Sequence, residues 1–591
     1  MAGCDALEIV PTMDINDTRT LAEAIEDLAH YRDGGYRFLE AGPDGAILED
    51  YRPFPEVHRQ ARQRAASLQA AGLGKGDRLA IVMPDTEAFV SAFLGCVMAG
   101  IVPVPIFPPD GLVQLDRYGA TVAAILGRCE AKAVLLSSRL EEALLTIPGL
   151  PQLPFTLLTP ERLDALEADF SPVVIGPDDL AFLQFTSGST ATPKGVRVSH
   201  RNIRANTGSI RRAFALTPND VPVSWLPLFH DMGLIGFLLT TVYATVSTRF
   251  IPTLSFLKRP DFWLRAMSHY RGTIAVAPSF AFGLVARRLT DAQVANLDLS
   301  TWRIAGSGAE PVRVGDLQAF ARRLEPAGFD QRAFLPMFGL AEATLAVTIP
   351  PLASGLRYQT VDRTALGAEG VARAPDSTAN AVDIVNCGPA IDCGQIAIFA
   401  PDDEASRTPL PERTVGEIRV RGEHLFDGYW DDPEATAAAH AGDYLRTGDL
   451  GYLDQGELYV CGRIKGLIIV NGRNFFPDDI ERIVFGKAGV RTAFAFQTSG
   501  SADAPGKVVL AAEVVEPERF DPGQLRHAVH AELGLTLDDI VPLEKGRLPK
   551  TSSGKPRRQE ACRLYESGKL RPLDLTAARP TPSRTESEPV T

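Results

Sequence analysis

The most informative polar segment of the chain is a run of small residues that ends in a lysine, Thr186-Ser-Gly-Ser-Thr-Ala-Thr-Pro-Lys194. It follows Leu180–Phe185, an apolar stretch with the length of a buried strand. Small residues let backbone N–H groups approach an anion closely, and the hydroxyls and the lysine can neutralise a phosphate. The segment is neither a Walker A loop nor a G-x-S-x-G hydrolase elbow. Taken alone, it is more often an ordinary loop than a phosphate-binding site.

Three further polar clusters stand beside apolar segments: Gly306-Ser-Gly-Ala-Glu310, Phe338-Gly-Leu-Ala-Glu342-Ala-Thr and Tyr444-Leu-Arg-Thr-Gly-Asp449. Ligands collect at strand ends in open α/β sheets, so these clusters and the small-residue loop are candidates for one site. Glu342 offers the hard oxygen ligands that Mg²⁺ prefers, and Asp449 can hold the hydroxyls of a ribose. Each also has a structural interpretation, because Glu342 can be a helix N-terminal charge and Asp449 a turn residue.

Two more segments gain a chemical meaning only in combination with these. Leu548-Pro-Lys-Thr-Ser-Ser-Gly-Lys555 is a Ser/Gly loop that can deliver a mobile lysine to a site on another domain, although a basic surface loop has the same composition. Met232–Tyr243 follows His230-Asp231, and its glycines leave room for an acyl chain along one helix face. A plain core helix would show the same pattern.

The elements that must position these residues alternate between apolar strands and helices up to about Pro350. Buried strands are predicted at Arg78–Met83, Ile101–Ile106, Ala133–Ser137, Leu180–Phe185, Thr273–Ala277 and Trp302–Ala305. Helices are predicted at Glu87–Met98, Arg117–Cys129 and Pro311–Leu324. This alternation predicts parallel sheets covered by helices on both faces, which is an α/β fold.

The chain is expected to divide into a large N-terminal domain at 1–462 and a smaller, mobile α+β domain at 463–571. Within the large domain, short turn-bounded strands at 381–462 predict a β subdomain. The preceding segment, 350–377, has few apolar periodicities and is expected to be an irregular insertion that lies over the body. Residues 572–591 are rich in Pro, Thr, Ser and Glu and are expected to be disordered.

Composition limits the classes of function. The 591 residues carry a net charge of −13, which argues against a general nucleic-acid binder. Seven cysteines are scattered without a C-x-x-C pair, so reduced thiols and a cytoplasmic location are expected. The N-terminus lacks the apolar region of a signal peptide. The longest uncharged run, Ala88–Pro109, is broken by a glycine and prolines, so no membrane span is expected.

Six motifs occur in one order along the chain: TSGSTATPKGV, GSGAEP, FGLAEAT, YLRTGDLGY, GRIKGLIIVNGRNFFPDDIE and LPKTSSGKPRR. Over roughly residues 20–570 this order resembles the adenylate-forming superfamily of acyl-CoA synthetases, nonribosomal adenylation domains and luciferases. The segment Trp225-Leu-Pro-Leu-Phe-His230-Asp231-Met-Gly-Leu-Ile-Gly236 and the position of the insertion resemble the fatty acyl-AMP ligase branch. One departure is Lys465-Gly466 after the hinge arginine, where these ligases often have Lys-Asp.

The resemblance implies ATP and Mg²⁺ as cofactors and assigns a role to each motif. The residues implied to hold the β- and γ-phosphates are Thr186, Ser187, Gly188, Ser189, Thr190 and Lys194. Those implied to flank the adenine are Ala309, Glu310, Phe338 and Gly339, and Ala341 is implied to bind the cofactor as well. Glu342 with Thr186 would place Mg²⁺, and Asp449 with Arg463 would hold the ribose.

The resemblance also implies how the two domains cooperate. Lys555 would reach the α-phosphate and the substrate carboxylate, and a hinge at Lys465 would turn the small domain. The residues implied to line the fatty acyl site are Trp225, His230, Asp231, Met232, Ile235 and Gly236.

The implied reaction joins a fatty acid to AMP from ATP and then transfers the acyl group to the phosphopantetheine thiol of an acyl carrier protein. Such a reaction belongs to lipid metabolism or to polyketide or lipopeptide biosynthesis. No carrier domain is apparent in the sequence, so that partner is expected to act in trans. Two alternatives stay open: a fatty acyl-CoA synthetase, and a catalytically silent nucleotide- or acyl-binding protein. The intact Lys555, Asp449 and Glu342 oppose the silent alternative, and the insertion favours the ligase.

Overall fold

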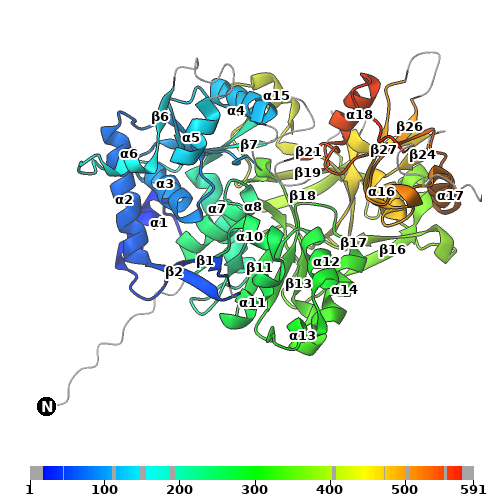
Figure 1. The fold of residues 1–591 in the computed structure, drawn as a ribbon, viewed down its shortest axis with the longest axis horizontal. Coiled ribbons are helices and arrows are strands. Elements are labelled where there is room, and N and C mark those ends of the chain that lie inside the picture. The colour runs from blue at the N-terminus through cyan, green and yellow to red at the C-terminus, as the bar shows by residue number, and fades with distance from the viewer. Residues whose placement is uncertain are drawn as a thin grey trace, which may run out of the picture.

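A computed structural model of the chain describes residues 17–43, 45–109, 115–145, 155–186, 193–401, 408–470, 473–500, 506–551 and 556–575. In Figure 1 the blue-to-green elements form a larger body, and the orange and red elements form a smaller one beside it. Yellow-green strands lie between the two bodies. Among the described residues, no helix is long and apolar enough to cross a membrane.

The first sheet of the larger body is parallel, as the alternating pattern predicts. Its strand order is β4-β3-β5-β6, with bounds β3 Arg78–Val82, β4 Val102–Pro105, β5 Ala133–Leu136 and β6 Thr156–Leu158. The helices of this region are α1 Leu21–Asp27, α2 Phe54–Ala70, α3 Thr86–Met98, α4 Leu115–Arg128, α5 Ser138–Leu145 and α6 Pro160–Asp164. All four residues of β5 are buried, as expected for a strand covered on both faces.

A second parallel sheet has the order β11-β12-β13, with bounds Ile274–Ala277, Ile304–Ser307 and Phe334–Pro336. The neighbouring helices are α10 Thr253–Lys258, α11 Asp261–His269, α12 Ser279–Arg288, α13 Asp291–Val294 and α14 Val314–Leu324. Trp302 precedes β12 instead of opening it, and its ring packs edge-on against Trp263 and Phe320 in the core. The predicted helix at Pro311 begins three residues later, at Val314.

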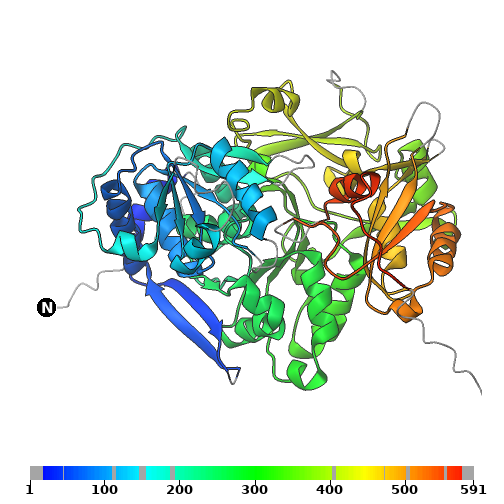
Figure 2. The ribbon, with the colours of Figure 1, turned by 45° about the horizontal axis from the view of Figure 1, so that its top comes forward.

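A third sheet of the larger body is mixed. Its order is β2-β1-β10-β9, with bounds β1 Gly35–Ala41, β2 Ile47–Pro53, β9 Val223–Ser224 and β10 Arg249–Phe250. Figure 2 shows the β1–β2 hairpin, in blue, projecting from the body.

The small-residue loop connects two antiparallel strands. These are β7 Leu180–Thr186 and β8 Lys194–Ser199, with Thr186 directly opposite Lys194. Helix α7, His200–Ala213, follows at once, and a capping box between Ser199 and Asn202 starts it. The two residues that flank the loop, Thr186 and Lys194, are therefore neighbours across the ladder.

The β subdomain is an antiparallel sheet. Its strands are β18 Gly394–Phe399, β19 Gly416–Gly422, β20 His440–Ala441, β21 Tyr444–Asp454 and β22 Glu457–Arg463, beside helix α15 Pro433–Ala438. Asp449 lies in the middle of β21, so the interpretation of Asp449 as a turn residue is wrong. Two short strands, β14 Phe338–Gly339 and β15 Ala346–Thr348, pair just before this sheet.

The expected irregular insertion contains regular structure. Strand β16, Tyr358–Asp362, pairs antiparallel with β17, Ala381–Val385, and a π-helical turn at Ala365–Glu369 follows β16. Val361 and Leu366 are buried in a cluster with aromatic residues of β21 and β22. The apolar pattern is weak because only two of the five β16 side chains are buried.

The C-terminal body has its own core. Its elements are β23 Ile468–Val470, β24 Arg473–Phe475, α16 Pro477–Val484, β25 Val490–Gln497, β26 Val508–Val514, α17 Pro522–Leu533, β27 Asp539–Leu543 and α18 Arg558–Glu566. Buried residues from 468 to 570 form two clusters of this body. We propose 462/463 as the domain boundary. Leu573 still donates its N–H to Pro542, inside the expected tail, whose residues 576–591 lie outside the described part.

Candidate active site

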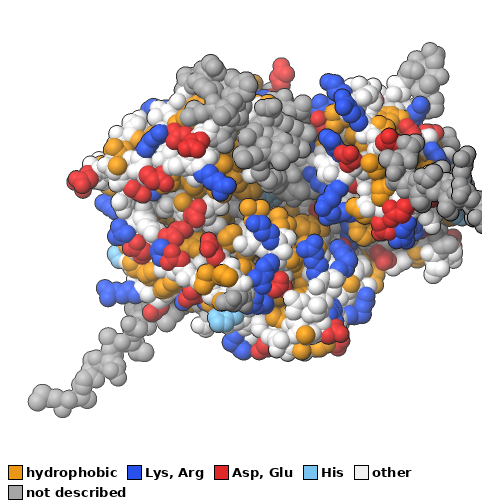
Figure 3. Space-filling view, viewed as in Figure 1, with side chains coloured by type: hydrophobic (Ala, Val, Ile, Leu, Met, Phe, Trp, Pro, Cys, Tyr) orange, Lys and Arg blue, Asp and Glu red, His pale blue; other side chains and the backbone are white. Residues whose placement is uncertain are grey.

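A cavity of about 1520 Å³ lies between the two bodies. Figure 3 shows hydrophobic, Lys and Arg side chains gathered where the bodies meet. The predicted site residues that line the cavity are Thr186, Lys194, His230, Asp231, Met232, Gly236, Ala309, Glu310, Phe338, Gly339, Ala341, Glu342, Asp449, Arg463 and Lys465. Five predicted residues lie outside the described part of the chain: Ser187, Gly188, Ser189, Thr190 and Lys555.

We call the part of the cavity where the phosphates are predicted to bind the phosphate end; it combines a cation, a carboxylate and a tyrosine. Lys194 opens β8, and its Nζ lies 4.7 Å from the centre of the Tyr429 ring. The Tyr429 hydroxyl donates a hydrogen bond of 2.8 Å to Oε1 of Glu342. Burial and the neighbouring Glu342 raise the pKa of Tyr429, so the phenol stays protonated and remains a donor.

Tyr429 is a site residue that the sequence reasoning missed. It follows Gly428 in a short segment between β19 and α15 that carries none of the six motifs. A tyrosine after a glycine is also common in ordinary turns, so the sequence alone holds no signal that singles it out.

The part of the cavity where the adenine is predicted to bind, the adenine end, is shaped by backbone. Ala309 has a φ of +68°, a left-handed conformation that is uncommon outside glycine. Glu310 turns back and accepts a hydrogen bond of 2.7 Å from the N–H of Phe280. A Cβ on Gly339 would lie 2.0 Å from the carbonyl oxygen of Leu345, so only glycine lets β14 approach β15 here. Ala309, Glu310, Phe338 and Gly339 all line the cavity.

The residues predicted to hold the ribose, at what we call the ribose end, are a pair on adjacent strands. Asp449 on β21 and Arg463 on β22 are register partners, and Arg463 Nε donates to Asp449 Oδ1 over 2.6 Å. The Asp449 charge raises the pKa of Arg463. Thr447 fixes the strand backbone beside Asp449, because its hydroxyl accepts from the Asp449 N–H and donates to the Ile418 carbonyl. Arg463 is 66% exposed, so the guanidinium faces the open cavity.

The residues present fit a magnesium nucleotide. Among the described residues no group of three His, Cys, Asp or Glu side chains could hold a metal on its own. Mg²⁺ is commonly bound through one or two carboxylates together with substrate phosphates and water. Glu342 supplies such a carboxylate, and Thr186, which also lines the cavity, supplies a hydroxyl.

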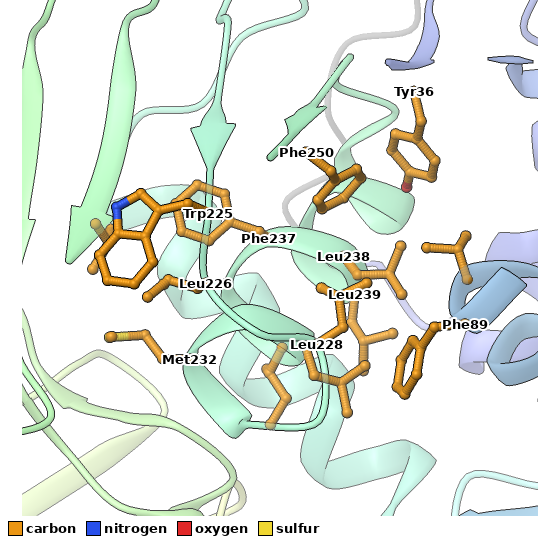
Figure 4. Packing of buried hydrophobic residues seen from close by; sticks show 14 of the residues in the cluster. Tyr36, Phe89, Trp225, Leu226, Leu228, Met232, Phe237, Leu238, Leu239 and Phe250 are labelled. Atoms are coloured by element: carbon orange, nitrogen blue, oxygen red, sulfur yellow. The ribbon is translucent and has the colours of Figure 1, made fainter. Parts of the chain in front are cut away.

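The part of the cavity where the acyl chain is predicted to lie, the acyl end, is built from a helix with a π-helical segment. Helix α8, Asp231–Gly233, passes into a π-helical turn, Leu234–Leu239, and then into α9, Thr240–Ala244. Figure 4 shows Leu238 and Leu239 on the side of this segment that faces the core residue Phe89. The apolar residues that face the cavity include Ile210, Phe214, Met232, Phe237, Ile274, Val276, Leu345 and Ile349.

Glycine keeps this end open. A Cβ on Gly236 would meet only Leu345 Cδ2, at 3.4 Å, so the position borders free space. Two predicted acyl residues do not line the cavity. Trp225 is 3% exposed and stacks on Phe256 with ring centres 3.8 Å apart, and Ile235 is buried on the core side. Both have hydrophobic types that suit a pocket and a core equally, so their predicted role at the acyl site stays a prediction.

The small body closes the cavity on its other side. The predicted hinge residue Lys465 lies in a 3₁₀ turn, Ile464–Gly466, and Gln559 Nε2 donates to the Lys465 carbonyl over 3.4 Å. Arg558 is held by Glu481 and Asp478 at 2.7 Å. Thr551 and Pro556, which flank the segment that contains Lys555, both line the cavity.

The insertion touches the small body directly. Arg363 lies after β16, and its Nη1 is 3.0 Å from Oδ2 of Asp479 on α16. The two side chains are only 12% and 17% exposed. Burial raises the pKa of Asp479, and Arg363 opposes that rise. Phe476 of the small body packs against the same cluster that holds β16 on the larger one.

Comparison with known proteins identifies the class. The model of the AMP-binding enzyme family matches residues 44–430, and the chain therefore belongs to that family. It is 34% identical to the medium-chain-fatty-acid–[acyl-carrier-protein] ligase JamA of Moorena producens, covering 92% of this chain and 94% of that one. It is 33% identical to a putative acyl-CoA synthetase of Caulobacter vibrioides, covering 94% and 97%.

A solved structure agrees with the fold. A chain from a study of fatty acyl-adenylate ligases of E. coli and L. pneumophila superposes with a TM-score of 0.87 at 36% identity. The match covers 94% of this chain and 99% of that chain, so both bodies are included.

Proposed function

We propose that the chain is a fatty acyl-AMP ligase. It would join a fatty acid to AMP from ATP, release pyrophosphate, and pass the acyl group to the phosphopantetheine thiol of an acyl carrier protein. One observation carries the proposal: a single cavity joins a polar end, with Lys194, Glu342 and the Asp449–Arg463 pair, to an apolar end beside Gly236. The names of full-length relatives, such as JamA, support the same reaction.

Adenylation would proceed by positioning and charge, with little covalent work for the protein. Lys194 and the loop after Thr186 would neutralise the β- and γ-phosphates, and Asp449 with Arg463 would hold the ribose. Lys555 would neutralise charge between the α-phosphate and the fatty carboxylate. A carboxylate oxygen attacks the α-phosphorus, the bond to the bridging oxygen of the β-phosphate breaks, and pyrophosphate leaves.

Glu342 and Thr186 would hold Mg²⁺ beside the phosphates. When bound, the ion supplies positive charge to phosphate oxygens. After adenylation, a turn at Lys465 would move the small body away and admit the carrier's thiol. The thiolate then attacks the acyl carbonyl carbon, the acyl–phosphate bond breaks, and AMP leaves.

The contact between the insertion and the small body supports a carrier protein over free CoA as acceptor. Arg363 and Asp479 tie the two together through a largely buried pair, which restricts how the small body can settle after adenylation. The alternative, a fatty acyl-CoA synthetase, shares the first half-reaction and is favoured by the Caulobacter relative.

A product assay separates the two. The enzyme is incubated with ATP, a panel of fatty acids, and either CoA or a phosphopantetheinylated acyl carrier protein, and products are identified by mass spectrometry. The ligase predicts acyl-AMP throughout and acyl-carrier protein as the only thioester formed at a useful rate. Acyl-CoA formed as fast as the acyl-carrier product would establish the synthetase instead.

The buried pair offers a sharper version of that assay. Arg363→Ala is expected to loosen the small body and to let some acyl-CoA form, while the rate of acyl-AMP formation stays unchanged. Arg373→Ala is the matched control, because Arg373 lies in the same insertion but pairs at the surface with Glu369. A deletion of 353–376 is a blunter test, since it removes β16 and its buried side chains.

A further inference from the structure

A short strap connects the phosphate lysine to the metal carboxylate. We define the strap as residues 426–430, between β19 and α15. Its first N–H, from Phe426, donates to the Glu342 carbonyl over 2.9 Å. Its last, from Trp430, donates to the Gly195 carbonyl, one residue after Lys194, over 2.7 Å. The strap is thus bonded by backbone to both sides of the phosphate end.

The direction of the Tyr429 side chain is fixed within this strap. Gly428 has a φ of +117°, and a Cβ there would lie 2.7 Å from Cγ2 of Thr436, so the turn needs glycine. The Tyr429 N–H donates to the Thr436 hydroxyl over 2.9 Å. An isolated β-bridge to Val196 holds the other edge of the residue. The ring therefore points into the cavity that it lines.

Tyr429 lies between two opposite charges. Its hydroxyl donates to Glu342 at 2.8 Å, and its ring face holds the Lys194 ammonium at 4.7 Å. Both charged residues are described, and they form no ion pair with each other within 4.0 Å. A direct pair would cancel both charges and compete with a magnesium nucleotide for each of them.

We propose that Tyr429 is a positioning residue that keeps Lys194 and Glu342 apart and aims each at its own part of a magnesium nucleotide. The hydroxyl orients the Glu342 carboxylate, as outer partners of metal ligands commonly do. The ring gives the ammonium a weak cation–π partner that a phosphate can displace. This inference rests on the proposed nucleotide site. It adds Tyr429 to that site, with separate roles for its hydroxyl at Glu342 and for its ring at Lys194.

Two substitutions separate the two contacts. Tyr429→Phe removes the hydroxyl and keeps the ring. It is therefore expected to raise by about tenfold the Mg²⁺ concentration at which the effect of the metal on ATP binding is half-maximal. ATP binding without metal should stay unchanged. Tyr429→Leu removes the ring as well and frees Lys194 to pair with Glu342. It is expected to weaken ATP binding in the absence of metal too, by about threefold to tenfold.

The measurement is a direct titration of ATP binding by calorimetry, with EDTA and then over a series of Mg²⁺ concentrations. Tyr452→Phe is the matched control, because Tyr452 is fully buried and donates to Gln359 at 3.0 Å but does not line the cavity. Thermal unfolding of each variant confirms that it is folded.

The outcomes are distinguishable. If the wild-type protein binds no ATP, the proposed function fails before Tyr429 is tested. If it binds ATP and Tyr429→Phe keeps a half-saturating Mg²⁺ concentration within twofold of wild type, the positioning role is overturned. A loss of metal-free ATP binding in Tyr429→Phe equal to that in Tyr429→Leu would also overturn it, because the ring would then carry no separate role.

Discussion

The two ends of the cavity are built in different ways. The nucleotide end is made of short polar contacts between neighbours on a few strands, such as Asp449 with Arg463 and Tyr429 with Glu342. The acyl end is made of apolar side chains from α7, the π-helical segment and β11, and no single contact defines it. The first end is specified by residue identity and the second by the space that packing leaves open.

That difference has a consequence for mutation. At the nucleotide end a changed side chain removes a charge or a hydrogen bond, so the loss concentrates in one step of the reaction. At the acyl end a changed side chain alters a volume, so the loss depends on the length of the substrate. Each of the following tests relies on this contrast between the two ends and has an outcome that would contradict it.

The largest effect is expected at Lys555. Lys555→Ala should slow adenylation by two to three orders of magnitude, because removing one positioned charge from a transition state costs about 3–4 kcal/mol. Transfer from supplied acyl-AMP should change much less. Lys550→Ala in the same segment is the control, since Lys550 is exposed and does not line the cavity. Equal losses in both half-reactions would contradict the role of Lys555.

Asp449 tests the ribose end. Asp449→Ala should weaken ATP binding by about 1.5–3 kcal/mol, the range for hydrogen bonds to charged groups, for every fatty acid alike. Asp454→Ala is matched to it, because Asp454 lies on the same strand and pairs with Arg413 away from the cavity. A lower melting temperature with unchanged ATP affinity would assign Asp449 a purely structural role.

The same contrast explains what could be predicted from the sequence. The parallel sheets follow from continuous apolar runs, and the nucleotide end follows from motifs in which polar residues stand together. Tyr429 was missed because its partners, Lys194 and Glu342, are far from it in sequence and meet it only through the strap. Strand β25 is not among the strands predicted above, although four consecutive residues of it, 493–496, are buried.

The acyl end shows the limit most clearly. Trp225 and Gly236 stand in one motif, yet the structure places Trp225 in the core and Gly236 on the cavity. The type of an apolar residue does not indicate whether it faces a ligand or the core, since a pocket and a core favour the same residue types. In the insertion, β16 was hidden because few of its side chains are buried.

Helix α7 connects the nucleotide end of the cavity to the acyl end. The pH dependence of thermal unfolding tests whether the two ends unfold together. It begins after β8 and carries Ile210 to the acyl wall. Burial lowers the pKa of His200, its first residue, from 6.5 to about 4. At pH values between these two pKa values, His200 is protonated in the unfolded chain but neutral in the folded one. The free energy of unfolding therefore falls as pH falls, by up to about 2 kcal/mol near pH 5.

His200→Gln should therefore flatten the fall of the melting temperature between about pH 7 and about pH 5. His527→Gln, at an exposed position, should leave the wild-type slope. Both ends should melt in one transition that ATP shifts as a whole. Two separate transitions would show that the ends are independent units and that α7 does not couple them.

The smallest effect, and the most selective, is expected at Gly236. Gly236→Leu adds a side chain where a Cβ would meet only Leu345 Cδ2 at 3.4 Å, so the fold accepts it and the cavity shortens. Long fatty acids should lose about tenfold in kcat/KM, the equivalent of about 1.4 kcal/mol, while short ones and ATP binding stay near wild type. Gly127→Leu, where nothing lies within 4 Å, controls for helix stability. An equal loss at every chain length would place Gly236 beside the reacting carboxylate. The contrast between a nucleotide end specified by residue identity and an acyl end specified by its volume would then be wrong.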